Sequence, residues 1–141
     1  MHILIAIENA NLRRSLEYLL SEEAGVNIVG QVSECEGMLA LINSTKPDLV
    51  IFDENLPGCS FEDLLHQVHQ QAFQPYLILL ARDRRDEKTI LATGVDAVVI
   101  KGEPPETLLA AFRRIRRLAR SSQRTGGAKA PFGQDKLDTS D

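Results

Sequence analysis

The chain has 141 residues, a length that favours one domain with a single hydrophobic core. Apolar residues make up 43% and charged residues 26% of the sequence, which excludes a fibrous or a largely disordered protein. The net charge of −4 argues against a surface built throughout for nucleic acid.

Five short runs rich in Ile, Leu and Val are typical of buried strands. They lie at residues 2–7, 26–32, 48–53, 76–81 and 96–100. The segments between them show helical spacing of apolar residues, most clearly in three stripes. These are Leu12, Leu16, Leu19 and Leu20; then Phe61, Leu64, Leu65 and Val68; and finally Leu108, Phe112, Ile115 and Ala119. Weaker patterns at 34–44 and 84–93 indicate two further helices.

Alternating strands and helices, with strands that are apolar at nearly every residue, predict a parallel sheet covered on both faces. We expect a doubly wound, flavodoxin-like α/β sandwich of five strands and five helices, because right-handed crossovers favour the strand order 2-1-3-4-5. In that order the first and third strands are neighbours, and a crevice opens beyond their carboxyl ends.

Charged residues follow three of these strands at that edge. Glu8 and Asp53 would face each other across the crevice and offer the hard oxygen ligands that suit Mg²⁺. Lys101 ends the fifth strand, where its ammonium could neutralise phosphate oxygens while Asp53 acts as the nucleophile in phosphoryl transfer. Taken singly, an Asp in this position often caps a turn and a Lys is often only solvated.

At these residues the chain resembles the receiver domains of two-component response regulators, and the NarL/FixJ-like subfamily in particular. The resemblance covers about residues 2–120, and its most specific segment is "PDLVIFDENLPG". It implies that Asp53 is phosphorylated by a histidine kinase or a phosphotransfer protein, and that Lys101 pairs with the phosphate. It also implies that Glu8 and the backbone carbonyl of Asn55 join Asp53 around Mg²⁺.

Several positions depart from that family pattern. Ile7 stands at the first position of the usual acidic pair, so Mg²⁺ binding should be weakened. Leu80 replaces the Thr or Ser that donates a hydrogen bond to the phosphoryl group, and Val98 replaces the aromatic switch residue. Gly102 follows Lys101 where the family has proline. The pattern indicates an atypical receiver, which either accepts phosphate poorly or accepts it without the usual coupling to its output face.

The last predicted helix carries five arginines off its apolar stripe, namely Arg113, Arg114, Arg116, Arg117 and Arg120. One interpretation is a docking face for an acidic partner protein or for a second copy of the chain. The other is a solvated helix end whose arginines pair with acids elsewhere in the chain. Direct contact with nucleic acid is disfavoured, because no aromatic residues interleave with the arginines.

Composition changes after residue 121, so we expect residues 1–121 to form the receiver domain and 122–141 a flexible tail or linker. Cys35 and Cys59 have no CxxC spacing, and we expect neither a disulfide scaffold nor a zinc site. No stretch is long and apolar enough for a membrane span, and Glu8 interrupts the first apolar run too early for a signal peptide, so we expect a cytoplasmic protein.

Two functions remain open. The first is a phosphoacceptor signalling domain, which is not an enzyme in its own right. The second is a phosphorylation-independent interaction module, a pseudo-receiver. A small flavin- or nucleotide-binding enzyme is disfavoured because no glycine-rich loop follows the first strand.

Overall fold

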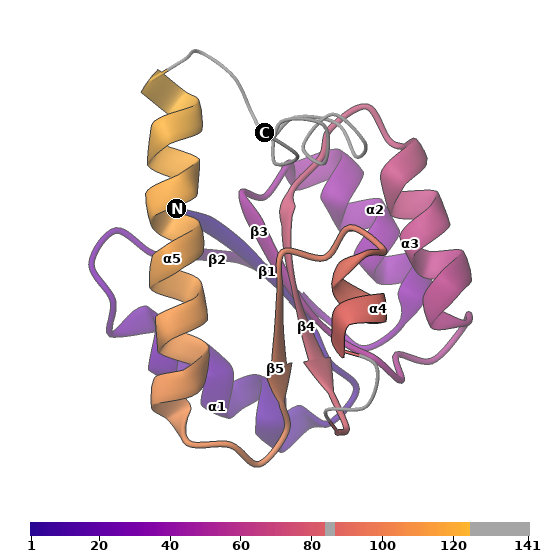
Figure 1. Ribbon diagram of the computed structural model, residues 1–141, viewed down its shortest axis with the longest axis horizontal. Helices are drawn as coiled ribbons and strands as arrows, with labels where there is room; N and C mark the ends of the chain where they lie inside the picture. Colours follow the sequence, from indigo (N-terminus) through magenta and orange to yellow (C-terminus); the bar gives the residue numbers. More distant parts are fainter. Residues whose placement is uncertain (84–86, 125–141) are drawn as a thin grey trace.

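The computed structural model describes residues 1–83 and 87–124, in which strands and helices alternate (Figure 1). The strands are β1 (His2–Ala6), β2 (Asn27–Val32), β3 (Leu49–Asp53), β4 (Tyr76–Ala81) and β5 (Ala97–Ile100). The helices are α1 (Ala10–Ser21), α2 (Cys35–Thr45), α3 (Phe61–Gln70), α4 (Glu87–Leu91) and α5 (Pro105–Arg124). Each of the five predicted strands is present. The predicted helix at 84–93 is present as the shorter α4, and residues 84–86 lie outside the described part.

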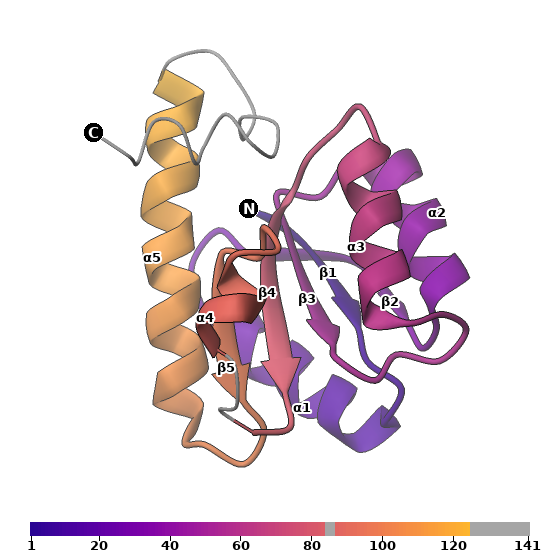
Figure 2. The same cartoon turned by 45° about the vertical axis from the view of Figure 1, so that its right-hand side comes forward.

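All five strands are parallel and follow the order β2-β1-β3-β4-β5, which confirms the predicted fold. Helices α1 and α5 cover one face of the sheet, and α2, α3 and α4 cover the other (Figures 1 and 2). The sheet is thus the middle layer of a three-layer sandwich.

Side chains along each strand alternate between the two faces with a period of two. On β3, Leu49 and Ile51 pack under α1 and α5, whereas Val50 and Phe52 pack under α2 and α3. The four strand residues from Leu49 to Phe52 are completely buried. The two apolar faces explain why the strands read as unbroken hydrophobic runs in the sequence.

Polar caps fix where the helices begin. The side chain of Asn9 accepts a hydrogen bond from the backbone N–H of Leu12 at the start of α1. Ser60 does the same for Asp63 at the start of α3, as its spacing from Asp63 predicts. α5 begins at Pro105, whose fixed φ suits the first helical position.

The predicted domain boundary after residue 121 falls inside α5, which continues to Arg124. Residues 122–124 of the predicted tail are thus helical, and the division into a receiver domain at 1–121 and a tail at 122–141 stays a prediction. The remaining tail residues, 125–141, lie outside the described part. The composition changes here before the helix ends, because Ser and Gln are tolerated in the last turn of a helix. Within the described residues, no helix has the length and apolarity needed to cross a membrane.

Cys35 and Cys59 form a disulfide bond, which corrects the expectation that they lack such a role. Cys35 is the first residue of α2, and Cys59 lies in the loop between β3 and α3. Their Cα atoms are 6.2 Å apart, although 24 positions separate them in sequence. The parallel sheet places the loop after β3 beside the start of α2. The spacing of the two cysteines along the chain does not indicate that they are neighbours in space.

Burial on α5 supplies a direct test of the packing. Phe112 is completely buried beneath the sheet-facing side of the helix, whereas Leu118 on the same helix is 44% exposed. We expect Phe112→Ala to lower the free energy of unfolding by about 3–5 kcal/mol, because it removes a ring and leaves a cavity. Leu118→Ala should change it by less than about 1 kcal/mol. Urea denaturation measures both, and equal losses would contradict this packing.

Candidate functional site

Asp53 is the last residue of β3, and its side chain continues the row that Leu49 and Ile51 begin on the α1/α5 face. It is 5% exposed, and Gln74 is the only other polar residue as well buried within the described part of the chain. A buried carboxylate requires a cation or hydrogen-bond donors. The partners of Asp53 therefore define the site.

Lys101, the residue after β5, is the first of these partners. Its Nζ lies 2.7 Å from Oδ1 of Asp53. β4 lies between β3 and β5 in the sheet. Its residue Leu80 is the register partner of Asp53, so the Lys101 side chain passes over Leu80 to reach the carboxylate. The Lys101 side chain is 31% exposed and that of Asp53 only 7%, so the ammonium lies at the rim and the carboxylate beneath it. The structure thus brings together two residues that the sequence predicted to act together.

The loop after β3 supplies the second partner. The backbone N–H of Asn55 donates to Oδ1 of Asp53 at 3.0 Å, and that of Leu56 donates to the Asp53 carbonyl. Glu54 leaves the site, since its Oε1 accepts a hydrogen bond from the backbone N–H of Arg82 beyond β4. The two adjacent carboxylates therefore have separate roles, with only Asp53 bound to Lys101.

Glu8 lies in the loop after β1, at the same edge of the sheet, and is exposed. Next to it the guanidinium of Arg13 donates from Nη1 to the backbone carbonyls of Ile7 and Glu8. Sequence reasoning missed this arginine, because its spacing on α1 marks only an exposed helix position. Arg13 holds the backbone that carries Glu8.

The three substituted positions are apolar residues at or near the ends of their strands. Ile7 is completely buried and packs with the α1/α5 face, and Leu80 is 4% exposed on the same face. Neither offers an oxygen or a donor to the carboxylate beside it. Val98 is half-buried and packs on the opposite face, against the α2–α4 layer.

The oxygen donors at this edge suit Mg²⁺ in kind but are few. Glu8 and Asp53 are carboxylates, and Asn55 has a backbone carbonyl nearby in sequence. Mg²⁺ is often held by one or two carboxylates and keeps several waters. Among the described residues no three His, Cys, Asp or Glu side chains gather as a metal site would require. The donor set therefore fits a weakly bound, largely hydrated ion.

An apolar groove of about 290 Å³ adjoins Lys101 between α1 and the start of α5. Its lining includes Leu12, Leu16, Leu80, Lys101 and Pro105. Tyr18, 73% exposed on α1, also borders it. The groove is an apolar surface that adjoins Lys101 and therefore lies close to the Lys101–Asp53 contact.

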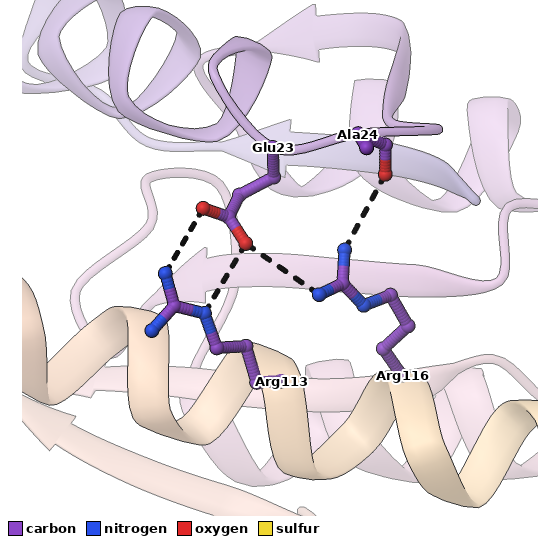
Figure 3. Close-up of polar contacts among 4 residues, drawn as sticks. All are labelled: Glu23, Ala24, Arg113 and Arg116. Carbon is purple, nitrogen blue, oxygen red and sulfur yellow. Dashed lines mark hydrogen bonds and ion pairs between the residues drawn. The ribbon is translucent and has the colours of Figure 1, made fainter.

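Two of the five arginines predicted to form the interaction face are bound to one acid of the same chain (Figure 3). Arg113 donates from Nε and Nη2 to the two carboxylate oxygens of Glu23, at 3.2 and 3.1 Å. Arg116 lies 3.6 Å from the same carboxylate, donates to the Ala24 carbonyl and stacks over the Phe112 ring. These contacts clamp α5 onto the turn after α1.

The other three arginines differ among themselves. Arg114 donates to the backbone carbonyl of Asp96, before β5. Arg117 and Arg120 are exposed. The predicted five-arginine interaction face is therefore divided, since three of its members bind within the chain.

The Asp53–Lys101 contact should contribute to stability. Lys101→Met keeps the aliphatic stem but removes the donor from a buried carboxylate, so we expect a loss of about 1–3 kcal/mol in the free energy of unfolding. The exposed Lys88→Met is the matched control and should be nearly neutral. In urea denaturation, Asp53→Asn with Lys101→Met should cost less than the sum of the single changes. If Lys101→Met and Lys88→Met changed the free energy of unfolding equally, the stabilising role of the Asp53–Lys101 contact would be contradicted.

The hydrogen bonds from Arg113 lower the pKa of Glu23 from its ordinary value. A lowered carboxyl pKa stabilises the fold above the ordinary pKa, and this contribution is lost as the pH falls through the folded-state pKa. We expect Arg113→Gln to raise the pKa of Glu23, and Arg117→Gln to leave it unchanged. An NMR titration of the side-chain carboxyl carbon measures both. An unchanged pKa in Arg113→Gln would contradict the ion pair.

Curated proteins with similar sequences include response regulators. Over 114 residues the chain is 27% identical to the nitrate/nitrite response regulator protein NarL of Escherichia coli, covering 79% of this chain and 53% of that protein. Over 103 residues it is 34% identical to the two-component response regulator PhoP of Pseudomonas aeruginosa, covering 72% and 45% respectively. The chain thus spans about half the length of these curated relatives.

Solved structures show the same fold. The signal receiver domain of a putative Luxo repressor protein from Vibrio parahaemolyticus superposes with a TM-score of 0.81 at 19% identity, covering 89% of this chain and 97% of that one. The receiver domain of the response regulator NarL from Mycobacterium tuberculosis gives 0.72 at 18%, covering 82% and 95%. Residues 3–113 match the family described as the response regulator receiver domain. With a buried aspartate and a lysine meeting at the carboxyl edge of a 2-1-3-4-5 sheet, the chain belongs to the receiver-domain family of two-component response regulators.

Proposed function

We propose that this receiver accepts a phosphoryl group on Asp53 and that Lys101 stabilises the charge of the phosphorylated state. The observation that carries the proposal is the 2.7 Å contact between Lys101 Nζ and Asp53 Oδ1. It places a cation beside a carboxylate that is otherwise buried, at the edge where parallel sheets bind ligands. The domain is a signalling component and not a metabolic enzyme.

The contacts of Asp53 suggest which of its two carboxylate oxygens is the nucleophile. Lys101 and the Asn55 N–H both bind Oδ1. Oδ2 is then the oxygen that attacks phosphorus. The new O–P bond forms as the bond from phosphorus to the donor breaks, which is a P–N bond if the donor is a phosphohistidine. The released imidazole nitrogen then takes up a proton from solvent. Lys101 neutralises the growing negative charge without changing its own position greatly.

Magnesium binding is part of the proposal in a weakened form. Glu8, Asp53 and the Asn55 carbonyl would hold the ion, and when bound it would neutralise charge on the phosphoryl oxygens. Ile7, completely buried at the position of a further acid, removes one ligand. We therefore expect a lower Mg²⁺ affinity than a receiver with two adjacent acids would have.

The proposed partners are a histidine kinase or a phosphotransfer protein, which could bind the apolar groove beside Lys101. A homodimer or an acidic partner would use Arg117 and Arg120, which are both exposed on α5. We propose a cytoplasmic location and no direct contact with nucleic acid or membrane by the described residues. Residues 1–121 with the end of α5 form the receiver unit.

One observation favours the second function, a phosphorylation-independent interaction module. Leu80 has no donor for a phosphoryl group, and Val98 is too short to replace an aromatic switch residue. A hydrogen bond to a charged group contributes about 1.5–3 kcal/mol, comparable with the gap between two conformations of a switching domain. Phosphorylation could then occur with little conformational consequence.

Loading with a small phosphodonor tests the proposal. The protein is incubated with Mg²⁺ and acetyl phosphate, and intact-mass spectrometry should show one phosphoryl group added. Asp53→Asn should abolish the adduct, whereas Glu54→Gln, which changes the neighbouring acid, should retain it. Lys101→Met should slow loading by on the order of 10²-fold.

Two results would contradict the proposal. An adduct that persists in Asp53→Asn would move the acceptor elsewhere. No adduct on the unaltered protein, under conditions that load an ordinary receiver, would favour the interaction module.

A further inference from the structure

The Cys35–Cys59 disulfide joins the start of α2 to the loop that leaves the phosphoacceptor strand. Cys59 lies only six positions after Asp53, and Ser60, the next residue, caps α3. No part of the proposed phosphoryl chemistry uses either sulfur. The bond therefore needs an explanation of its own.

The loop between Asp53 and Cys59 is also held to α2 by its backbone. The N–H of Cys35 donates to the Pro57 carbonyl at 2.8 Å. Gly58, with a φ of +105°, passes close enough that a Cβ there would lie 3.6 Å from Cys35. The Cys35 Sγ lies 3.7 Å from the Leu56 carbonyl, within reach of a weak hydrogen bond once the sulfur carries a proton. The two segments are thus positioned to stay adjacent whether or not the sulfurs are bonded.

The two cysteine residues differ in burial. Cys35 is 3% exposed, whereas Cys59 is only partly buried in the loop. A thiolate from solution therefore meets the Cys59 side of the bond first. In the cytoplasmic location proposed above, thiols are kept reduced, and disulfides that form there are usually transient, redox-sensing or catalytic.

We propose that Cys35 and Cys59 are a reversible thiol–disulfide site whose oxidation state sets the order of the loop that follows Asp53. Its reaction partners are low-molecular-weight thiols and disulfides. A thiolate attacks the Cys59 sulfur and forms a mixed disulfide, and the released Cys35 thiolate takes a proton. A second thiolate then attacks the small-molecule sulfur and releases the Cys59 thiolate. In sum, one protein disulfide and two thiols give one protein dithiol and one small disulfide, and oxidation is the reverse.

The loop transmits this change to the site through Asn55 and Leu56. Their N–H groups bind Oδ1 and the carbonyl of Asp53, and both lie between Asp53 and the bond. With the disulfide closed, the segment from Asp53 to Cys59 is restrained at one end by β3 and at the other by the covalent bond to Cys35. After reduction, only the backbone hydrogen bond from Cys35 to Pro57 and weaker contacts hold it to α2. The oxidised form should hold Asp53 in a narrower range of orientations.

The test begins with the full chain in a series of glutathione buffers from reducing to oxidising. Alkylation and mass spectrometry should show both cysteines free at the reducing end and neither free at the oxidising end. Hydrogen exchange at the amides of Cys35, Asn55 and Leu56 should be several-fold slower in the oxidised protein. The Arg13 amide, bonded within α1 to Asn9, is the internal control and should not change.

Cys59→Ser supplies the matched variant, since it should exchange like the reduced protein in every buffer. A disulfide that stays closed in all buffers, or never forms, would overturn the reversible site. Identical exchange of oxidised and reduced protein would overturn control of the loop. These readouts do not involve phosphoryl transfer, so they stand or fall independently of loading at Asp53. A loading-rate difference between the two redox forms, absent in Cys59→Ser, is expected if the proposed function also holds.

Discussion

The strand order β2-β1-β3-β4-β5 is the constraint on which every contact at the site depends. It places the ends of β1 and β3 side by side. β5 is separated from β3 by one strand, β4. Because side chains alternate with a period of two, Ile7, Asp53, Leu80 and Lys101 all continue the α1/α5 face. A lysine from β5 can then reach across Leu80 to a carboxylate on β3. A shift of one residue in any of these strands would turn its side chain to the opposite face.

The burial of Asp53 makes its few polar contacts decisive for the chemistry of the site. A carboxylate that is 5% exposed needs compensation, and here a single oxygen receives both an ammonium and a backbone N–H. The same donors suit the extra negative charge of a phosphoryl group. What the site lacks is equally specific, because Ile7 and Leu80 place methyl groups where an acid and a hydroxyl would assist. In the proposed function, acceptance of phosphate and transmission of a signal therefore rest on different residues.

Most of the fold could be predicted from the sequence, because unbroken apolar strands and amphipathic helices report burial directly. Asp53 and Lys101 were predictable for the same reason, since strand ends in a known order fix which residues meet. The disulfide was not, because its two cysteines are adjacent only through the packing of α2 against the loop after β3. The arginines of α5 were resolved only by structure, since Glu23 lies about 90 residues earlier and nothing in its local pattern indicates a partner. Arg13 donates hydrogen bonds to backbone carbonyls, and because every residue has such a carbonyl, the sequence does not indicate these contacts.

We propose that Lys101 and Asp53 form a phosphoryl-accepting pair. The most direct measurement is a high-resolution structure of the protein treated with Mg²⁺ and beryllofluoride, which imitates a phosphoryl group. We expect beryllofluoride bonded to an oxygen of Asp53, with Lys101 Nζ contacting one of its fluorine atoms. A structure in which Asp53 carries no adduct and still holds Lys101 unchanged would contradict it.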